Sequence, residues 1–458
     1  MKIQLKAFRK KEDLKKHLKS HAETLFYASG TSTVIPYPNL GKVLRGKGFE
    51  HLYMGDLNAL PQKMDFAEEG SLEIEGPVTW KDARGFCLNH GRNIMVSPTE
   101  ELACMLAGIA TSASGERSFG FGPLREHITE VEYLDFEGKE QTLYSKNLLI
   151  NHPLFQSEKG KKLLEAYQKS YEKYDGFKNA PFPRLEKETD LMVGMEGQLG
   201  VVTKANFDTI RNETTRFLFI KLPKWEEDFK PHLEIFYNTQ NFRDHLISVE
   251  LLDHNCLSYL PDEEKPLPAG HDIIFLEVKL SSFDLIIENL VPTLALTPDD
   301  HIFEMNGDKC HHLRMLIPRF ISEVNQRRGV KKKGTDVQVP KDSFETLINY
   351  YRDFSTKGIS YNLFGHFGDG HLHFNFLPLA EEEEKCQNLL TEFYRKIKSI
   401  HGSPFAEHGI GLLKQDFIAP FLTEVQLEMY RYLKENLDPK NQFFPQGFLN
   451  LFRGNKND

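Results

Sequence analysis

Residues 361–376 constrain the fold more than any other stretch of the 458-residue chain. Apolar and polar side chains alternate on both sides of Asp369-Gly370, and this dipeptide is the strongest short-range indication of a two-residue β-hairpin turn. With that turn, His366 is expected to face His373, their Cβ atoms about 4.5–5.5 Å apart. The pattern therefore predicts a hairpin with one face of imidazoles and one hydrophobic face.

The same alternation places His371 and Asn375 on the imidazole face. The opposite face is expected to carry Phe367, Leu372, Phe374 and Phe376. Taken alone, this pattern also fits a surface hairpin whose histidines have only a structural role.

A second motif, residues 407–411 with the sequence Glu-His-Gly-Ile-Gly, follows a strongly patterned helix and supplies a carboxylate. Two imidazoles and one carboxylate with an open position suit a catalytic divalent ion such as zinc. Iron and manganese accept the same ligands. The expected metal ligands are therefore His366, His373 and Glu407, with zinc as the first choice of ion.

Composition excludes several classes of function. The net charge of −9 is spread along the chain, which disfavours nucleic-acid binding. Five cysteines without a CxxC pair argue against a disulfide framework and for a reducing compartment, so a cytoplasmic location is expected. The N-terminus lacks a signal-peptide pattern, and no apolar segment approaches the roughly 20 residues of a membrane span. Peripheral membrane association stays open.

Three runs rich in small residues precede residue 205, at 28–33, 107–115 and 193–203. None matches the GxGxxG or GxxxxGK[ST] pattern. Small side chains let backbone N–H groups approach a phosphate, although close helix packing is an equal alternative for the second run. Together the three runs suggest an extended cofactor that is bound by several loops.

Ser97, Pro98 and Glu100 form the sequence of a capping box, which predicts a helix carrying Leu102, Met105 and Leu106. From about residue 212 the pattern changes. A βαβ-like unit is expected from a strand at 217–222, a helix at 225–237 and a strand at 247–252. Further strands at 273–280 and 301–304 and helices at 313–326 and 380–401 follow, with a kink expected at Pro318.

These runs, in this order, resemble the FAD-linked oxidases and dehydrogenases of the vanillyl-alcohol oxidase/PCMH type, in the D-2-hydroxy-acid dehydrogenase branch. D-lactate dehydrogenases, the glycolate oxidase D subunit and D-2-hydroxyglutarate dehydrogenase belong to that branch. Residues 365–375 are similar to its G-H-x-G-D-G-N-x-H-x-N motif, 407–411 to E-H-G-x-G, and 437–445 to its L-D-P-x-x-x-x-N-P end. The resemblance covers nearly the whole chain.

The resemblance implies an α+β fold with a PCMH-type FAD-binding domain at 1–211. It also implies an α+β substrate (cap) domain with an antiparallel sheet at 212–415, and a helical segment at 416–458 that returns to the FAD domain. No histidine or cysteine lies at 27–33, so FAD is expected to be non-covalent. The implied FAD-binding residues are Ala28, Ser29, Gly30, Thr31, Ser32, Pro98, Gly108, Thr111, Ser112, Ser114, Gly115, Glu196, Gly197, Gly200, Val201 and Val202.

The implied reaction is the metal-assisted oxidation of a small D-2-hydroxy acid, such as D-lactate, glycolate or a D-2-hydroxyglutarate-like acid, to the 2-oxo acid. A hydride would pass to the flavin and the electrons to an unidentified acceptor. His408 is the expected base, Arg314 would pair with the substrate carboxylate, and Asn375 would orient it. His371 replaces a family asparagine and would add a ligand or narrow the pocket.

Departures from the family leave the substrate open. Pro318 stands where the family often has threonine, and Gly334 stands at the position of a family lysine, with Lys333 one residue away. Two other functions remain as alternatives. One is the non-redox chemistry of an ether-lipid synthase on the same fold, and the other is a flavin-free 2-His-1-carboxylate metal protein.

Overall fold

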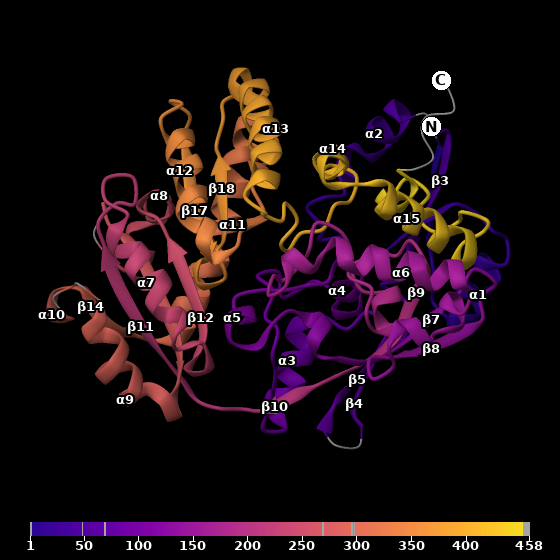
Figure 1. The fold of residues 1–458 in the computed structure, drawn as a ribbon, viewed down its shortest axis with the longest axis horizontal. Coiled ribbons are helices and arrows are strands. Elements are labelled where there is room, and N and C mark those ends of the chain that lie inside the picture. Colours follow the sequence, from indigo (N-terminus) through magenta and orange to yellow (C-terminus); the bar gives the residue numbers. More distant parts are fainter. Residues whose placement is uncertain are drawn as a thin grey trace.

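The computed structural model describes residues 2–47, 49–67, 70–267, 270–294, 296 and 298–451. Figure 1 shows two lobes, which the chain connects just after β10 (Thr209–Arg211). Helices and antiparallel sheets are combined, which confirms the predicted α+β class. The domain boundaries at 211 and 415 stay predictions, and residues 452–458 of the predicted C-terminal segment lie outside the described residues.

The first lobe contains two larger sheets. A parallel sheet has the order β1-β3-β2, and an antiparallel sheet has the order β4-β5-β9-β7-β8. The strands are β1 (Lys2–Ala7), β2 (Thr24–Tyr27), β3 (His51–Asp56), β4 (Lys63–Phe66), β5 (Leu72–Glu75), β7 (Ile128–Leu134), β8 (Glu140–Tyr144) and β9 (Val201–Phe207), and the short pair of β6 (Arg92–Ile94) with β10 lies beside them.

The helices of this lobe include two from the C-terminal end of the chain, α14 and α15. They are α1 (Lys11–Leu18), α2 (Leu40–Gly46), α3 (Trp80–Asn89), α4 (Met105–Thr111), α5 (Ser118–Phe121), α6 (Glu158–Ser170), α14 (Gln415–Ile418) and α15 (Glu424–Leu437). Leu164 and Tyr167 of α6 share one hydrophobic core with Met429 and Leu433 of α15, so the C-terminal helix lies against α6. Thr423 and Gln426 form the capping box that opens α15.

The helix predicted to begin at Pro98 is wrong. Residues 101–105 are bound to the start of α3 and the residues just before it: the Lys81 N–H donates to Glu101 O, and the Met105 N–H donates to Val78 O. These tertiary hydrogen bonds delay the helix until Met105, where α4 begins. The Ser97 hydroxyl lies 3.4 Å from Glu116 Oε1 and caps no helix.

The second lobe is built on an eight-stranded sheet with the order β14-β11-β13-β12-β17-β18-β15, and β16 also pairs with β18. The strands are β11 (Thr215–Leu222), β12 (Leu246–Leu252), β13 (Asp272–Lys279), β14 (Ile302–Met305), β15 (Lys333–Gly334), β16 (Val337–Gln338), β17 (Tyr361–His366) and β18 (His371–Phe376). Because β13 lies between β11 and β12 and is antiparallel to both, the predicted βαβ unit is split by an inserted strand.

Helices cover both faces of this sheet. One face packs on α7 (Lys230–Gln240), α12 (Phe344–Ser355) and α13 (Glu383–Ser399), and the other on α8 (His254–Ser258) and α11 (Gly307–Arg328). The shorter α9 (Phe283–Leu285) and α10 (Pro298–His301) lie near β14. Pro318 lies inside α11, which is longer than the helix predicted at 313–326.

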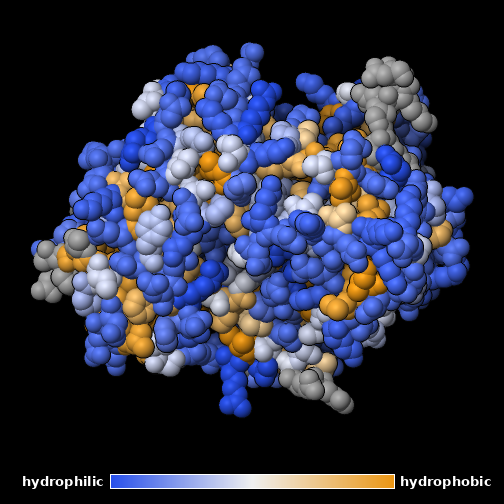
Figure 2. All heavy atoms as spheres, viewed as in Figure 1, coloured by the Kyte–Doolittle hydropathy of each residue, from blue (hydrophilic) through white to orange (hydrophobic). Residues whose placement is uncertain are grey.

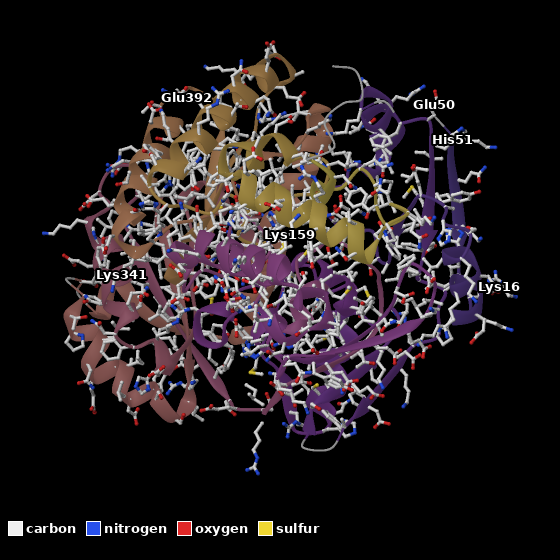
Figure 3. All side chains as sticks on the ribbon, turned by 45° about the vertical axis from the view of Figure 1, so that its right-hand side comes forward. Lys16, Glu50, His51, Lys159, Lys341 and Glu392 are labelled. Carbon is white, nitrogen blue, oxygen red and sulfur yellow. The ribbon has the colours of Figure 1, made fainter. Side chains whose placement is uncertain are left out.

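The surface is mostly polar. Figure 2 shows hydrophobic side chains only in separate small groups on the face in view. Charged side chains such as Lys16, Glu50 and Glu392 point away from the ribbon in Figure 3. In the described part of the chain, every helix is too short or too polar to cross a membrane.

Candidate active site

The hairpin of β17 and β18 has a different register from the one predicted. His366 faces His371, not His373, because residues 367–370 form a longer turn than Asp369-Gly370 alone. A two-residue type I′ turn needs positive φ at both central residues, and here only Gly370 has it, at 64°. Phe367 fills the turn and packs, fully buried, in the core beneath the sheet. The prediction of a two-residue turn is therefore wrong.

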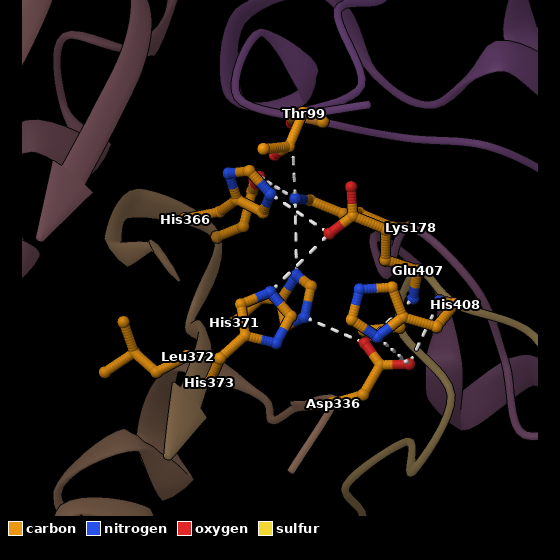
Figure 4. A network of polar contacts seen from close by, with 12 residues as sticks. Thr99, Lys178, Asp336, His366, His371, Leu372, His373, Glu407 and His408 are labelled. Carbon is orange, nitrogen blue, oxygen red and sulfur yellow. Dashed lines mark hydrogen bonds and ion pairs between the residues drawn. The ribbon is translucent and has the colours of Figure 1, made fainter. Parts of the chain in front are cut away.

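The predicted faces survive the shift of register because it amounts to two residues. The imidazoles of His366, His371 and His373 lie together, with ring centroids 4.6 to 6.2 Å apart. The four hydrophobic side chains predicted for the other face are buried in the core. The sheet thus presents three buried histidines toward the first lobe, as Figure 4 shows.

His366 and His373 each direct their Nε2 atom at the carboxylate of Glu407. His366 Nδ1–H donates to Glu250 Oε1 at 2.8 Å, and His373 Nδ1–H donates to the Thr335 carbonyl at 3.1 Å. Each Nε2 is then left with its lone pair. These atoms lie 3.2 Å (His366) and 3.7 Å (His373) from Glu407 Oε2. The sequence-predicted metal ligands are therefore brought together.

This arrangement fits a cation. Lone pairs of nitrogen and oxygen at such distances repel one another unless a proton or a metal ion lies between them. Despite burial, Glu250 and Glu407 raise the pKa of His366, and His366 with His373 holds the pKa of Glu407 well below its usual range. Two Nδ1–H groups fixed by oxygen acceptors are also the usual support of metal-bound histidines. The donor set matches a divalent ion such as zinc.

His408, the expected base, lies on the ring of His373, with centroids 5.1 Å apart. Its backbone N–H donates to Asp336 Oδ2 at 3.0 Å, and its Nδ1 lies 3.5 Å from the same oxygen. Desolvation outweighs the attraction of Asp336 and, with the nearby Lys332 ammonium, lowers the pKa of His408 to about 3. His408 is therefore neutral and can accept a proton on Nε2.

Arg314 lies at the site, but its guanidinium already has carboxylate partners. Its guanidinium is ion-paired with Glu116, and its Nε lies 3.4 Å from Glu250 Oε2. Nη2 donates to Thr99 Oγ1 at 3.3 Å. Pairing with a substrate carboxylate would require one of these partners to be displaced, so the expected role of Arg314 stays a prediction.

Asn375 is fully buried, and its amide N–H donates to Asn362 Oδ1 at 3.2 Å. Its Oδ1 has no hydrogen-bond partner among the described residues and lies close to Gly334, where a Cβ would come within 2.3 Å of it. The glycine at the family lysine position thus leaves room for the asparagine side chain.

The three runs of small residues converge on the loop that follows His408. The Glu196 N–H donates to the Ala110 carbonyl, joining the second and third runs. The Glu196 carboxylate accepts from the N–H groups of Ile410 and Gly411 at 2.6 and 3.0 Å. Burial raises the pKa of Glu196 to about 7. Val34, just after the first run, accepts from Leu412 at 3.0 Å.

Two of the predicted FAD-binding residues have side chains that could bind a polar group, and the contacts of the set with FAD stay a prediction. The hydroxyls of Ser112 and Ser114 are buried and have no hydrogen-bond partner in the described part of the chain. Residues 28–32 follow β2, Gly108 and Thr111 lie in α4, and residues 200–202 lead into β9. Pro98 lines a cavity beside Arg314. The carboxylate of Glu196 is already used by the loop, so its predicted contact with FAD stays a prediction.

Sequence reasoning missed four charged residues of the site: Glu250, Lys178, Lys332 and Asp336. Glu250 is the one charged residue in the otherwise apolar or small segment 247–252, and Asp336 begins a D-x-x-x-P run. A buried strand with a single carboxylate could have singled out Glu250. Lys178 carried no such pattern.

Comparisons with known proteins agree with this picture. Residues 305–446 match the family of FAD linked oxidases, C-terminal domain. D-lactate dehydrogenase (cytochrome), mitochondrial, of Kluyveromyces lactis is 21% identical over 413 residues, which cover 85% of this chain and 63% of that protein. A probable mitochondrial D-lactate dehydrogenase of Danio rerio is 23% identical, covering 87% of this chain and 76% of that protein.

Glycolate oxidase subunit GlcD of Bacillus subtilis is 23% identical over 275 residues, 56% of each chain. The chain spans 63% and 60% of the length of its two yeast D-lactate dehydrogenase relatives, which is less than two thirds. Among solved structures, alkyldihydroxyacetonephosphate synthase has a TM-score of 0.63 at 12% identity, covering 96% of this chain and 75% of that one. That likeness is one of fold alone.

Proposed function

We propose that this chain, of the FAD-linked D-2-hydroxy-acid dehydrogenase branch, oxidises a small D-2-hydroxy acid to the corresponding 2-oxo acid. The resemblance expected from the sequence is confirmed by the matched C-terminal domain and the named relatives. One observation carries the proposal: the Nε2 atoms of His366 and His373 meet Glu407 Oε2 on the side of the sheet that faces the first lobe.

His366, His373 and Glu407 would hold a divalent ion, with zinc as the first choice and manganese or iron as alternatives. Such an ion, when bound, lowers the pKa of a hydroxyl group beside it. Glu250 supports the site because it fixes the proton of His366 on Nδ1 and leaves Nε2 free.

His408 would take the hydroxyl proton on Nε2. Its Nδ1 side faces Asp336 Oδ2, which favours a proton on Nδ1 and a lone pair on Nε2. Desolvation and nearby cations weaken His408 as a base, and a negatively charged substrate beside it would offset the cations. Glu407 and His408 are consecutive residues, so one loop would position both the metal ligand and the proton acceptor.

Lys332 would meet the substrate carboxylate more readily than Arg314. No hydrogen bond or ion pair involves the Lys332 side chain among the described residues, whereas the guanidinium of Arg314 is bound by Glu116 and Glu250. The Lys332 ammonium interacts electrostatically with Glu407, and desolvation together with Lys414 lowers its pKa. Asn375 would orient the substrate from the same face as His373.

The FAD would lie along the small-residue runs, held non-covalently, with Ser112 and Ser114 as hydroxyl partners. When bound, FAD supplies the acceptor for the hydride that leaves the α-carbon. The residues at 27–33 offer no histidine or cysteine for a covalent link. The electron acceptor that reoxidises the flavin is left unassigned.

The direct test is anaerobic bleaching of the flavin absorbance by a panel of acids: D- and L-lactate, glycolate, and D- and L-2-hydroxyglutarate. We expect bleaching by at least one D-acid or by glycolate and slower or no bleaching by the L-acids. The variant His373→Leu should lose bound metal and bleaching but keep flavin, whereas His312→Leu, an exposed histidine of α11, should keep all three. The proposal would be excluded if dithionite bleached the flavin but none of the 2-hydroxy acids did.

A further inference from the structure

His371 lies between a group that can only donate and a group that can only accept. Its Nε2 is 3.1 Å from Asp336 Oδ1, and its Nδ1 is 3.5 Å from Lys178 Nζ. A carboxylate accepts and an ammonium donates, so the ring must carry its proton on Nε2 and its lone pair on Nδ1. All three side chains are buried.

This is the opposite tautomer from that of its two neighbours. His366 and His373 direct Nδ1 at oxygen acceptors and Nε2 at Glu407, while His371 directs its two nitrogens at Asp336 and Lys178 instead. Distance alone would group all three rings with Glu407, because their ligand atoms lie within 4.8 Å of one another. The hydrogen bonds distinguish His371 from His366 and His373.

Asp336, the partner of His371, binds the segment that carries the metal ligand and the base. Its Oδ1 accepts from the Glu407 N–H at 3.1 Å, and its Oδ2 accepts from the His408 N–H at 3.0 Å. Lys414 Nζ donates to Oδ2 at 2.7 Å. Asp336 is 1% exposed, so a lost hydrogen bond there could not be replaced by bulk water.

The other side of His371 is equally fixed. Lys178 Nζ lies 3.0 Å from Asp369 Oδ2 in the hairpin turn and donates to the Gly115 carbonyl of the second small-residue run at 3.5 Å. Both charged side chains of this ion pair are 3% exposed. A continuous polar chain therefore runs from the hairpin turn through Lys178 and His371 to Asp336.

We propose that Asp336 is a positioning residue that fixes the backbone of Glu407 and His408, and that His371 serves as its ring donor and not as a metal ligand. The roles of Glu407 and His408 rest on the proposed function, but the positioning itself does not. Substitution of the ring should loosen the backbone of Glu407 and His408 but remove none of the three ligand side chains of the metal.

The test is hydrogen exchange of the intact flavoprotein, read by mass spectrometry on peptides that contain the amides of Glu407 and His408. Asp336→Asn and His371→Leu should each make these amides exchange about tenfold faster or more, the effect of losing a hydrogen bond to a charged group. His371→Gln should restore protection, because the glutamine Nε2 can donate where the imidazole Nε2 does. His312→Leu should change nothing.

Unchanged exchange in both His371→Leu and Asp336→Asn would overturn the proposal, and so would equal exchange in His371→Leu and His371→Gln. The glutamine rescue separates a hydrogen-bonding role from general packing. It also covers the case in which Asp336→Asn does not fold.

Calorimetric titration with Zn²⁺ provides a second arm. His371→Leu should retain the zinc stoichiometry of the unsubstituted chain with at most about 10–100-fold weaker binding, whereas His373→Leu should lose the site. Loss of stoichiometric zinc in His371→Leu would make it a ligand and overturn that part of the proposal. If the unsubstituted chain bound no zinc, the metal part of the proposed function would fail, and the exchange experiment would still decide the positioning role.

Discussion

Arg117, in the segment between α4 and α5, forms a buried ion pair with Glu277 of β13, with Nη2 and Oε1 2.7 Å apart. The two side chains are 6% and 1% exposed and join the first lobe to the sheet of the second. The Thr215 hydroxyl also donates to Glu277 at 3.1 Å. The direct ion pair is therefore kept only as long as the two lobes keep this contact.

Breaking this pair should be costly. Arg117→Met or Glu277→Gln each leaves one buried charged or polar group without its partner, and we expect the free energy of unfolding to fall by roughly 3–5 kcal/mol in urea titrations. The matched control is Arg216→Met, which removes an exposed, solvent-screened pair with Glu304 on the same sheet and should cost far less. Equal costs at the two sites would contradict the assigned importance of burial.

Metal affinity should depend on Glu250. Glutamine at this position weakens the acceptor that orients His366, so Glu250→Gln should bind Zn²⁺ about 10–100-fold more weakly in calorimetric titrations. Glu304→Gln, on the edge strand β14 and half exposed, serves as the control. Identical affinities in the two variants would mean that the Glu250–His366 hydrogen bond does not support the site.

Lys332→Met should raise the KM for the 2-hydroxy acid roughly 10–100-fold, because a hydrogen bond from a charged group is lost. The effect on kcat should be small, since the carboxylate is bound similarly before and during the reaction. Lys331→Met, one residue away and likewise exposed, is the control. A normal KM in Lys332→Met combined with a raised KM in Arg314→Lys would mean that Arg314 binds the substrate carboxylate.

FAD affinity should reflect the two unpartnered hydroxyls. Ser114→Ala should weaken FAD binding roughly 2–10-fold, the value of one hydrogen bond, as measured by rebinding of FAD to the deflavinated chain. Ser399→Ala, exposed on α13, should bind FAD normally. Stronger FAD binding in Ser114→Ala would place the cofactor away from this hydroxyl.

The pH dependence of stability should include Asp253, which caps α8 and whose backbone N–H donates to the Leu363 carbonyl of β17. Burial and the neighbouring Asp272 raise the pKa of Asp253 from 3.8 to about 7. Between these values the unfolded chain is ionised while the folded chain keeps the proton, so this contribution to stability is present below pH 3.8 and is lost as pH rises through 7.

Asp253→Asn cannot titrate and keeps an oxygen that can cap the helix. Relative to the unsubstituted chain, it should gain stability between pH 5 and pH 8, by roughly 1–3 kcal/mol in urea titrations. Asp13→Asn, at an exposed position of α1, should show no such pH-dependent difference. A constant difference across that range would mean that Asp253 does not titrate there.

Local patterns predicted most of the elements but not their exact partners. The alternation in residues 361–376 predicted both faces of the hairpin, since a strand side chain points the same way at every second position. The predicted register was wrong because the burial of Phe367, and not the Asp369-Gly370 dipeptide, determined the length of the turn. The capping box at Ser97 failed for a related reason: hydrogen bonds with residues 78–81 hold residues 101–105, so that the helix begins only at Met105.

The proximity of His366, His373 and Glu407 could be predicted because their chemical types recur in a known motif, and their role as metal ligands stays a prediction. Their supports could not be predicted, because they come from distant parts of the chain. Glu250 lies 116 residues before His366, and Asp336 lies 71 residues before Glu407. Only the order of strands in the sheet brings these carboxylates to the histidines, and no local periodicity encodes that order.

The loop after His408 has a thermodynamic consequence. Glu407 and His408 lie at its start, while Glu196 and Val34 bind its next residues, from Ile410 to Leu412. One short stretch of backbone therefore borders both the metal ligands and the small-residue runs. A ligand that orders this stretch from one side lowers the entropy cost of binding on the other, and linkage makes the gain reciprocal: the factor by which flavin strengthens metal binding equals the factor by which metal strengthens flavin binding.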